Sequence, residues 1–123
     1  MSKFQKGSAL LVVVAVALVA SVSAFGGSSS ASATTVAVTA GKPSEFKFTL
    51  SKRTVAKGLK TFKVVNRGFI KHDFKIAGKK TPALATGKTA TLKVTFTKAG
   101  RFTYMCTLPG HAAGGMKGVL VVK

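Results

Sequence analysis

Apolar residues recur at every second position in a series of short runs that covers residues 35–122. The run at residues 45–50, for example, would place Phe46, Phe48 and Leu50 on one face of a strand. A period of two is that of a strand with one buried side, and no run after the N-terminal segment has the 3.6-residue period of a helix. About seven to eight such strands, with turn signals about every 8–12 residues, predict an all-β fold, a Greek-key antiparallel β-sandwich.

The inward face is less clear in residues 59–65 than in the other runs. Leu59, Val64 and either Thr61 or Phe62 are all candidates for the core. The alternation alone therefore leaves the phase of this strand open.

Basic residues occupy many outward positions. The clearest cases, each between two apolar residues, are Lys47, Lys63, Lys75 and Lys93. The chain has 20 Lys and Arg but only two carboxylates, Glu45 and Asp73, and a net charge of +18. Because the cations are dispersed, we expect no nucleic-acid partner and interpret them as a solvated coat, or as a surface for an acidic partner or anionic envelope. With two carboxyl groups to protonate, we also expect the fold to tolerate acid.

The first 24 residues have the composition of an export signal. Two lysines precede an apolar run at residues 9–22, and Val22-Ser23-Ala24 offers a small-residue cleavage site. The run is shorter than the ~20 residues that span a bilayer, so we favour cleavage, with an uncleaved membrane anchor as the alternative. We therefore expect an exported protein, periplasmic or extracellular, or tethered to the membrane through its N-terminus.

Residues 25–35 are rich in Gly, Ser and Ala and predict a flexible tether. The remaining residues, 36–123, are of a length that forms one domain. In an exported protein a single cysteine cannot form an internal disulfide, so its thiol is expected to be intermolecular, reactive or a metal ligand.

The chemically distinctive stretch is residues 104–116. It contains the only cysteine, Cys106, then His111 and Met116, with four residues between each pair. Thiolate, imidazole and thioether form a soft ligand set that suits copper, whereas a thioether is a poor fourth ligand for zinc. The only other histidine, His72, lies upstream, and two His and one Cys with an axial Met is the ligand set of blue-copper sites.

Met105 also adjoins Cys106 in the sequence. Strand alternation, however, puts Cys106 on the same face as Tyr104 and points Met105 to the opposite side. Met116 is the better candidate ligand, because it ends a glycine-rich loop that can fold back over a metal ion.

Three segments carry a resemblance to a known family. They are residues 62–68 followed by His72-Asp73-Phe74, residues 99–106, and residues 106–111 with Gly115-Met116-Lys117-Gly118. Together they resemble the cupredoxins, the type 1 blue copper proteins of the plastocyanin/azurin family, over about residues 36–123. The gap from cysteine to histidine is longer than in plastocyanins and is similar to that of the rusticyanins. The resemblance implies one type 1 copper ion bound by ring nitrogens of His72 and His111, the Cys106 thiolate and the Met116 sulfur.

The resemblance also concerns the surroundings of the ligands. The family often has Asn after the first histidine, bridging to the residue after the cysteine; here these positions hold Asp73 and Thr107. An Asp73 carboxylate that accepts the Thr107 hydroxyl would tie the ligand segments together, favour Cu(II) and lower the reduction potential. A simple exposed aspartate is the alternative. Asn66, in the turn before His72, is expected to belong to the same surroundings.

The residues around His111 carry no charge. They include Leu108, Pro109, Gly110, Ala112 and Ala113. We expect an uncharged surface on which a partner docks, extended by Phe69 and Ile70, although a merely compact turn is the alternative. Lys71 and Lys117 would flank this surface and steer an acidic partner.

The resemblance implies a one-electron carrier, cycling between Cu(I) and Cu(II). Its partners would be exported or membrane redox proteins such as a cytochrome, oxidase or reductase, and we expect a monomer. We do not expect an enzyme, because a copper oxidase or nitrite reductase needs further histidine-rich centres and the chain has two histidines. A copper-binding protein for delivery or storage remains the rival hypothesis.

Overall fold

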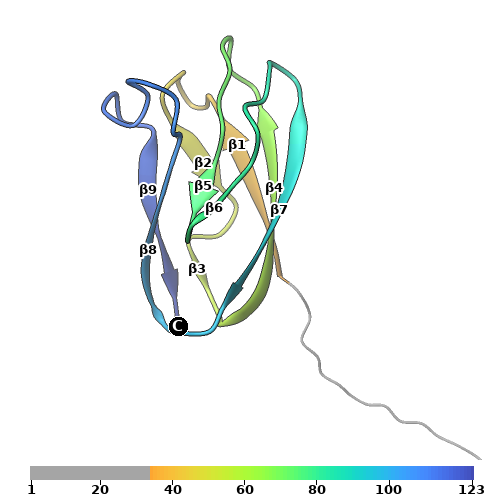
Figure 1. Ribbon diagram of the computed structural model, residues 1–123, viewed down its shortest axis with the longest axis vertical. Coiled ribbons are helices and arrows are strands. Elements are labelled where there is room, and N and C mark those ends of the chain that lie inside the picture. Colours follow the sequence, from red (N-terminus) through yellow and green to blue (C-terminus); the bar gives the residue numbers. More distant parts are fainter. Residues whose placement is uncertain (1–33) are drawn as a thin grey trace, which may run out of the picture.

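Two β-sheets face each other across an apolar core (Figure 1). The computed structural model describes residues 34–123. The strands are β1 Thr34–Ala40, β2 Phe48–Leu50, β3 Thr54–Val55, β4 Gly58–Asn66, β5 Lys75–Ile76, β6 Lys79–Lys80, β7 Thr89–Phe96, β8 Gly100–Met105 and β9 Lys117–Val122. One sheet has the order β2-β1-β4-β7, and the other has the order β3-β9-β8-β5-β6. The predicted all-β sandwich is confirmed.

Two strand pairs in the described residues are parallel rather than antiparallel. They are β1 with β4 and β3 with β9. The cause is the connection after β2, which crosses to β3 in the opposite sheet before the chain returns to β4 beside β1. Three of the nine described strands contain only two residues, which is why the sequence pattern indicated fewer.

Aromatic side chains join the two sheets in the core. Phe62 on β4 packs against Phe74, with ring centroids 5.4 Å apart, and Phe74 packs against Tyr104 on β8 at 5.6 Å. Val64 and Leu120 are buried in the same cluster. Burial of each such side chain contributes about 1.5–3 kcal/mol, so this layer holds the sheets together.

The outward lysines follow the predicted pattern. Lys63, Lys75 and Lys93 are exposed on β4, β5 and β7, and Lys47 is exposed just before β2. They cover the outer faces of the sandwich with positive charge, and Lys93 lies on the edge strand β7, where a lysine discourages pairing with another chain.

The phase of β4 differs from one of the expectations. Leu59 is 40% exposed, whereas Lys60 is 3% exposed and its Nζ lies 3.4 Å from Thr34 Oγ1. The reason is the period of two, because burying Phe62 and Val64 on one face also turns Lys60 inward. Of the candidates left open for this strand, Phe62 and Val64 face the core, whereas Leu59 does not.

The predicted export signal, residues 1–24, and residues 25–33 of the predicted tether lie outside the described residues. β1 begins at Thr34, so the last two residues that we assigned to the tether belong to a strand. In residues 34–123 no helix has the length and apolar character needed to cross a membrane.

Three connections come together at one end of the sandwich (Figure 1). They are residues 41–47 between β1 and β2, residues 67–74 between β4 and β5, and residues 106–116 between β8 and β9. The backbone N–H of Arg67 donates to the carbonyl of Ala40 at 2.8 Å, which joins the first two. The four candidate ligands and Asp73 lie in the second and third of these connections.

Candidate metal centre

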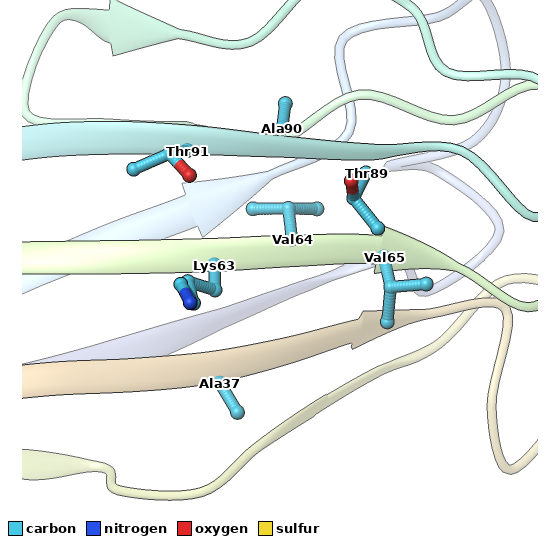
Figure 2. Close-up of a pocket in the computed structure, with 7 residues that line it drawn as sticks. All are labelled: Ala37, Lys63, Val64, Val65, Thr89, Ala90 and Thr91. Carbon is cyan, nitrogen blue, oxygen red and sulfur yellow. The ribbon is translucent and has the colours of Figure 1, made fainter.

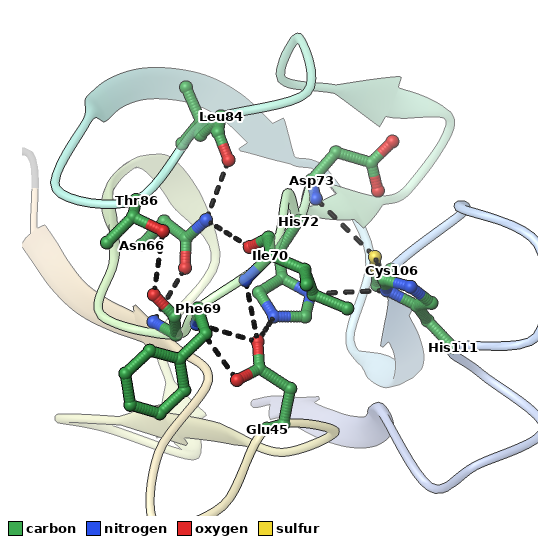
Figure 3. A network of polar contacts seen from close by, with 11 residues as sticks. Glu45, Asn66, Phe69, Ile70, His72, Asp73, Leu84, Thr86, Cys106 and His111 are labelled. Atoms are coloured by element: carbon green, nitrogen blue, oxygen red, sulfur yellow. Dashed lines mark hydrogen bonds and ion pairs between the residues drawn. The ribbon is translucent and has the colours of Figure 1, made fainter.

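His72, Cys106 and His111 converge where the three connections meet. Each offers one ligand atom, and these atoms all lie within 4.8 Å of one another. The Nδ1 atoms of the two histidines are 3.2 Å apart, and Cys106 Sγ is 3.4 Å from His111 Nδ1. Figure 3 shows the three side chains pointing toward one another. The sandwich thus brings together the two histidines and the cysteine that sequence spacing had singled out.

His72 is held by a network of backbone and amide hydrogen bonds. Its own N–H and carbonyl pair with the carbonyl and N–H of Leu84, at 3.2 and 2.8 Å. The buried Asn66 Nδ2 donates to the carbonyls of Ile70 and Leu84, at 2.8 and 2.7 Å, while its Oδ1 accepts the Gly68 N–H at 2.8 Å. Asn66 therefore fixes the shape of the loop that carries His72, as Figure 3 shows.

Cys106 directly follows β8 and is fully buried. Its backbone N–H donates to the carbonyl of Met116 at 3.1 Å, and the Met116 N–H donates to the carbonyl of His111 at 3.0 Å. The Met116 side chain is also fully buried and packs in one cluster with Cys106 and Ala40. Met105 is only partly buried at the end of β8. The loop therefore folds back so that Met116, rather than its neighbour in sequence, lies against the cysteine.

Asp73 joins the two ligand segments directly. Its Oδ1 accepts the backbone N–H of Thr107 at 2.6 Å, and its Oδ2 accepts the Thr107 hydroxyl. The Asp73 N–H points at Cys106 Sγ, 3.4 Å away. Asp73 is 2% exposed, so the alternative of a simple exposed aspartate is wrong.

Burial sets the ionisation of the metal-free side chains. Desolvation raises the pKa of the Cys106 thiol, while the Asp73 N–H acts in the opposite direction. Desolvation lowers the pKa of His111, and the neighbouring His72 adds to that effect. Burial therefore disfavours the charged form of both groups. A bound cation would compensate the negative charge of the Cys106 thiolate and would bind the His111 imidazole in its neutral form.

Glu45 is a site residue that the sequence reasoning did not identify. Its Oε2 lies 2.6 Å from His72 Nε2, the ring nitrogen that faces away from the other ligand atoms. The carboxylate also accepts the N–H of Phe69 at 2.9 Å and of Ile70 at 3.3 Å. These contacts, above all that from the Phe69 N–H, lower the pKa of Glu45. The sequence offered one signal, the rarity of acidic residues. The chain has only two acidic side chains, and both contact the ligand segments.

Phe46 also lies elsewhere than expected. β2 begins only at Phe48, so Phe46 belongs to the preceding turn and is 37% exposed instead of facing the core. Its ring packs edge-on against His111, with centroids 5.0 Å apart. The strand prediction failed because the turn after Gly41 continues through Phe46 before pairing with β1 begins.

The surface around His111 is largely apolar. His111 and Ala112 are partly exposed, as is Leu108, which packs against the Cys106 cluster. Pro109, Gly110 and Ala113 are exposed, and Lys117 is exposed at the start of β9. Phe69 is 88% exposed and Ile70 44%.

A separate hollow lies on the outer side of the first sheet (Figure 2). It is lined by Ala37, Lys63, Val64, Val65, Thr89, Ala90 and Thr91. None of these is a cysteine, histidine or carboxylate. Within residues 34–123, the group of side chains that could hold a metal ion therefore lies at the end that carries the three loops.

The donor set fits copper. Two imidazole nitrogens and a thiol sulfur face one another, and a buried thioether residue packs against the cysteine. Copper sites of the blue type use this combination, and hard cations such as magnesium prefer oxygen donors.

Comparison with known proteins gives a consistent result. The model of a family described as copper binding proteins, plastocyanin/azurin family, matches residues 34–123. No curated protein matches the chain.

Several solved structures resemble the sandwich. Auracyanin B has 20% identity and a TM-score of 0.66, covering 78% of this chain and 93% of its own. Auracyanin A of Chloroflexus aurantiacus, described as a "blue" copper protein, has 22% identity and a TM-score of 0.65, covering 75% and 100%. Reduced rusticyanin has 26% identity and a TM-score of 0.59, covering 77% and 82%. At these identities the two auracyanins establish the fold alone.

Proposed function

The chain belongs to the plastocyanin/azurin family of copper-binding proteins, and on that premise we propose that it carries single electrons between redox proteins. The observation that supports this most is the convergence of His72, Cys106 and His111. We propose that the histidines hold copper through Nδ1, Cys106 through Sγ, and Met116 through its sulfur. Bound copper would supply a one-electron couple between Cu(I) and Cu(II).

The protein's part in such a function is to keep the ligands fixed. Asp73 holds Thr107, the residue next to Cys106, while backbone hydrogen bonds close the loop from Cys106 to Met116. Full burial of Cys106 and Met116 keeps water from the sulfur atoms. A frame supported in this way changes little when the charge at its centre changes, which favours rapid electron exchange.

His111 would provide the route to the surface. Its ring is partly exposed, while its Nδ1 faces the centre, and its neighbours in the chain, residues 108–110 and 112–114, are uncharged. We propose that a redox protein docks on this uncharged surface, made of Leu108, Pro109, Gly110, Ala112 and Ala113 and extended by Phe46, Phe69 and Ile70. The exposed Lys71 and Lys117 would steer an acidic partner such as a cytochrome, oxidase or reductase.

We place this function outside the cytosol, because the first 24 residues have the composition of an export signal. An enzymatic role has less support. Copper oxidases and nitrite reductases need a second copper centre, and both histidines of the chain already belong to this one. The stronger rival is delivery or storage of copper, which uses the same ligand types.

Repeated oxidation and reduction in the presence of a Cu(I) chelator separates the two functions. A carrier is expected to show one reversible one-electron wave and to keep its copper over many cycles, because the ligands are preorganised. Quantitative transfer of copper to the chelator on the first reduction would favour delivery and contradict the proposal. Met116→Leu serves as a comparison in the same cycling experiment, because it keeps an apolar side chain of similar volume while removing the sulfur that we propose as a copper ligand.

A further inference from the structure

Glu45 contacts His72 on the side away from the candidate copper position. The Glu45 Oε2 to His72 Nε2 distance is 2.6 Å, and the histidine side chain is fully buried while the carboxylate is 24% exposed. His72 Nδ1 points the other way, toward His111 Nδ1. The two nitrogens of one ring therefore have separate partners, a carboxylate and the metal centre (Figure 3).

The packing of two loops makes room for this contact. A Cβ atom at Gly68 would overlap Glu45 Oε2 and lie 2.9 Å from His72 Nε2. On the other loop, Gly41 has a positive φ of 83°, and a Cβ atom there would lie 2.5 Å from the Gly68 Cα. The close approach of residues 41–47 to residues 67–72 thus depends on two glycines, and it delivers Glu45 to the histidine.

We propose that Glu45 is a positioning residue for the ligand His72, which holds the ring with Nδ1 toward the metal and stabilises Cu(II) relative to Cu(I). The inference rests on the copper site of the proposed function. A carboxylate that accepts Nε2–H fixes the tautomer and makes the other nitrogen a stronger donor. A stronger donor favours the more highly charged metal ion, so the contact lowers the reduction potential.

Glu45 also connects the ligand to the uncharged surface. The same carboxylate accepts the backbone N–H groups of Phe69 and Ile70, whose side chains are exposed. A purely structural brace would need only these backbone contacts. The potential of the metal centre distinguishes the two roles, because a brace leaves the electron-donating strength of His72 unchanged.

The test compares the reduction potentials of copper-loaded wild type, Glu45→Gln and Ser44→Lys. Glu45→Gln removes the charge but keeps an oxygen that can face His72. Ser44 is exposed and adjacent, so Ser44→Lys changes the net charge by the same single unit without removing the contact. The shift in Ser44→Lys therefore measures how much one unit of charge next to Glu45 changes the reduction potential while the contact with His72 is kept.

We expect Glu45→Gln to weaken Cu(II) binding relative to Cu(I) by about 10-fold to 100-fold, the usual effect of changing the group that supports a ligating histidine, because a neutral amide oxygen is a weaker acceptor for Nε2–H than a carboxylate. Each tenfold change raises the potential of a one-electron couple by about 59 mV. Ser44→Lys is expected to shift it far less. An unchanged potential in Glu45→Gln, or an equal shift in both variants, would overturn the inference.

A measurement on the metal-free wild type tests the positioning of the His72 ring by Glu45 even if Glu45→Gln does not fold. At alkaline pH, nitrogen NMR of the histidine rings reports which nitrogen carries the proton. We expect the proton of His72 on Nε2, facing Glu45; a proton on Nδ1 would contradict the inference. If the wild type shows no reversible one-electron couple, the proposed function fails, whereas the tautomer of His72 still tests the positioning role.

Discussion

The Nδ1 atoms of His72 and His111 lie 3.2 Å apart, although 39 positions separate the residues in the chain. Two imidazole nitrogens at this distance cannot both present a lone pair without repulsion unless a proton or a metal ion lies between them. Cys106 Sγ, 3.4 Å from His111 Nδ1, adds a third donor at the same point. The arrangement therefore favours the binding of a cation with affinity for nitrogen and sulfur.

Asp73→Asn is expected to raise the reduction potential of the copper-loaded protein. The substitution removes a buried negative charge next to the ligands, so Cu(II) loses more stabilisation than Cu(I). A tenfold change in their relative affinities would appear as about 59 mV in potentiometry. An unchanged potential would mean that Asp73 only ties the loops together.

Thr107→Val serves as the companion variant. It removes the hydroxyl that donates to Asp73 Oδ2 but leaves the backbone N–H contact and the carboxylate charge in place. We expect a loss of about 0.5–1.5 kcal/mol of stability, the usual value of one hydrogen bond, and a smaller change in potential than in Asp73→Asn. Denaturant unfolding of the metal-free protein measures the first quantity.

Lys117→Glu is expected to slow electron transfer to an acidic partner at low ionic strength. Lys117 is exposed beside the uncharged surface, so reversing its charge weakens the attraction during encounter. Stopped-flow rates should differ severalfold at low salt and converge at high salt, because screening removes the effect. Lys98→Glu is the matched control, since Lys98 is exposed on the connection from β7 to β8 at the opposite end of the sandwich. Equal slowing in both variants would argue against steering at this surface.

The metal-free protein is expected to lose little stability in acid. Glu45 has a pKa below its ordinary value of 4.5, so its contribution is present above that pH and is lost as the pH falls through the lowered value. His111 has a pKa below its ordinary value of 6.5, so the unfolded chain takes up a proton first and stability declines below pH 6.5. The chain has only two acidic side chains, so few protons are taken up by carboxylates in acid.

Thermal unfolding at about pH 8, 5 and 3 measures these two steps. Glu45→Gln should reduce the lower step while leaving the upper one in place. Complete unfolding of the wild type between the two lower pH values would contradict the expectation of acid tolerance.

The sandwich was predictable because its long strands each bury one face. β7 and β8 show the alternation clearly, and the outward positions of Lys93 on β7 and Arg101 on β8 follow from it. Strands of two residues, such as β3, leave no periodic signal and depend on a partner strand. Lys60 was missed because its burial follows from the phase of Phe62 and Val64, whereas its own polarity predicts exposure.

The candidate ligands were predictable from residue type and spacing, since the chain contains one cysteine and two histidines. Glu45 was not, because it reaches His72 from a loop 27 positions earlier in the chain. Its contact depends on how closely residues 41–47 approach Gly68, which no local pattern encodes. Phe46 was wrongly assigned to the core because the turn before β2 is longer than predicted.

Titration of the purified metal-free protein with Cu(II), followed by absorbance, tests the central claim most directly. A thiolate bound to Cu(II) together with two imidazoles gives an intense blue colour, so we expect it to grow to one copper per chain. Cys106→Ala should abolish the colour, whereas Ser44→Ala, at an exposed position that supplies no ligand atom, should retain it. A colourless copper complex of the wild type, or an undiminished blue colour in Cys106→Ala, would contradict the assignment of this site.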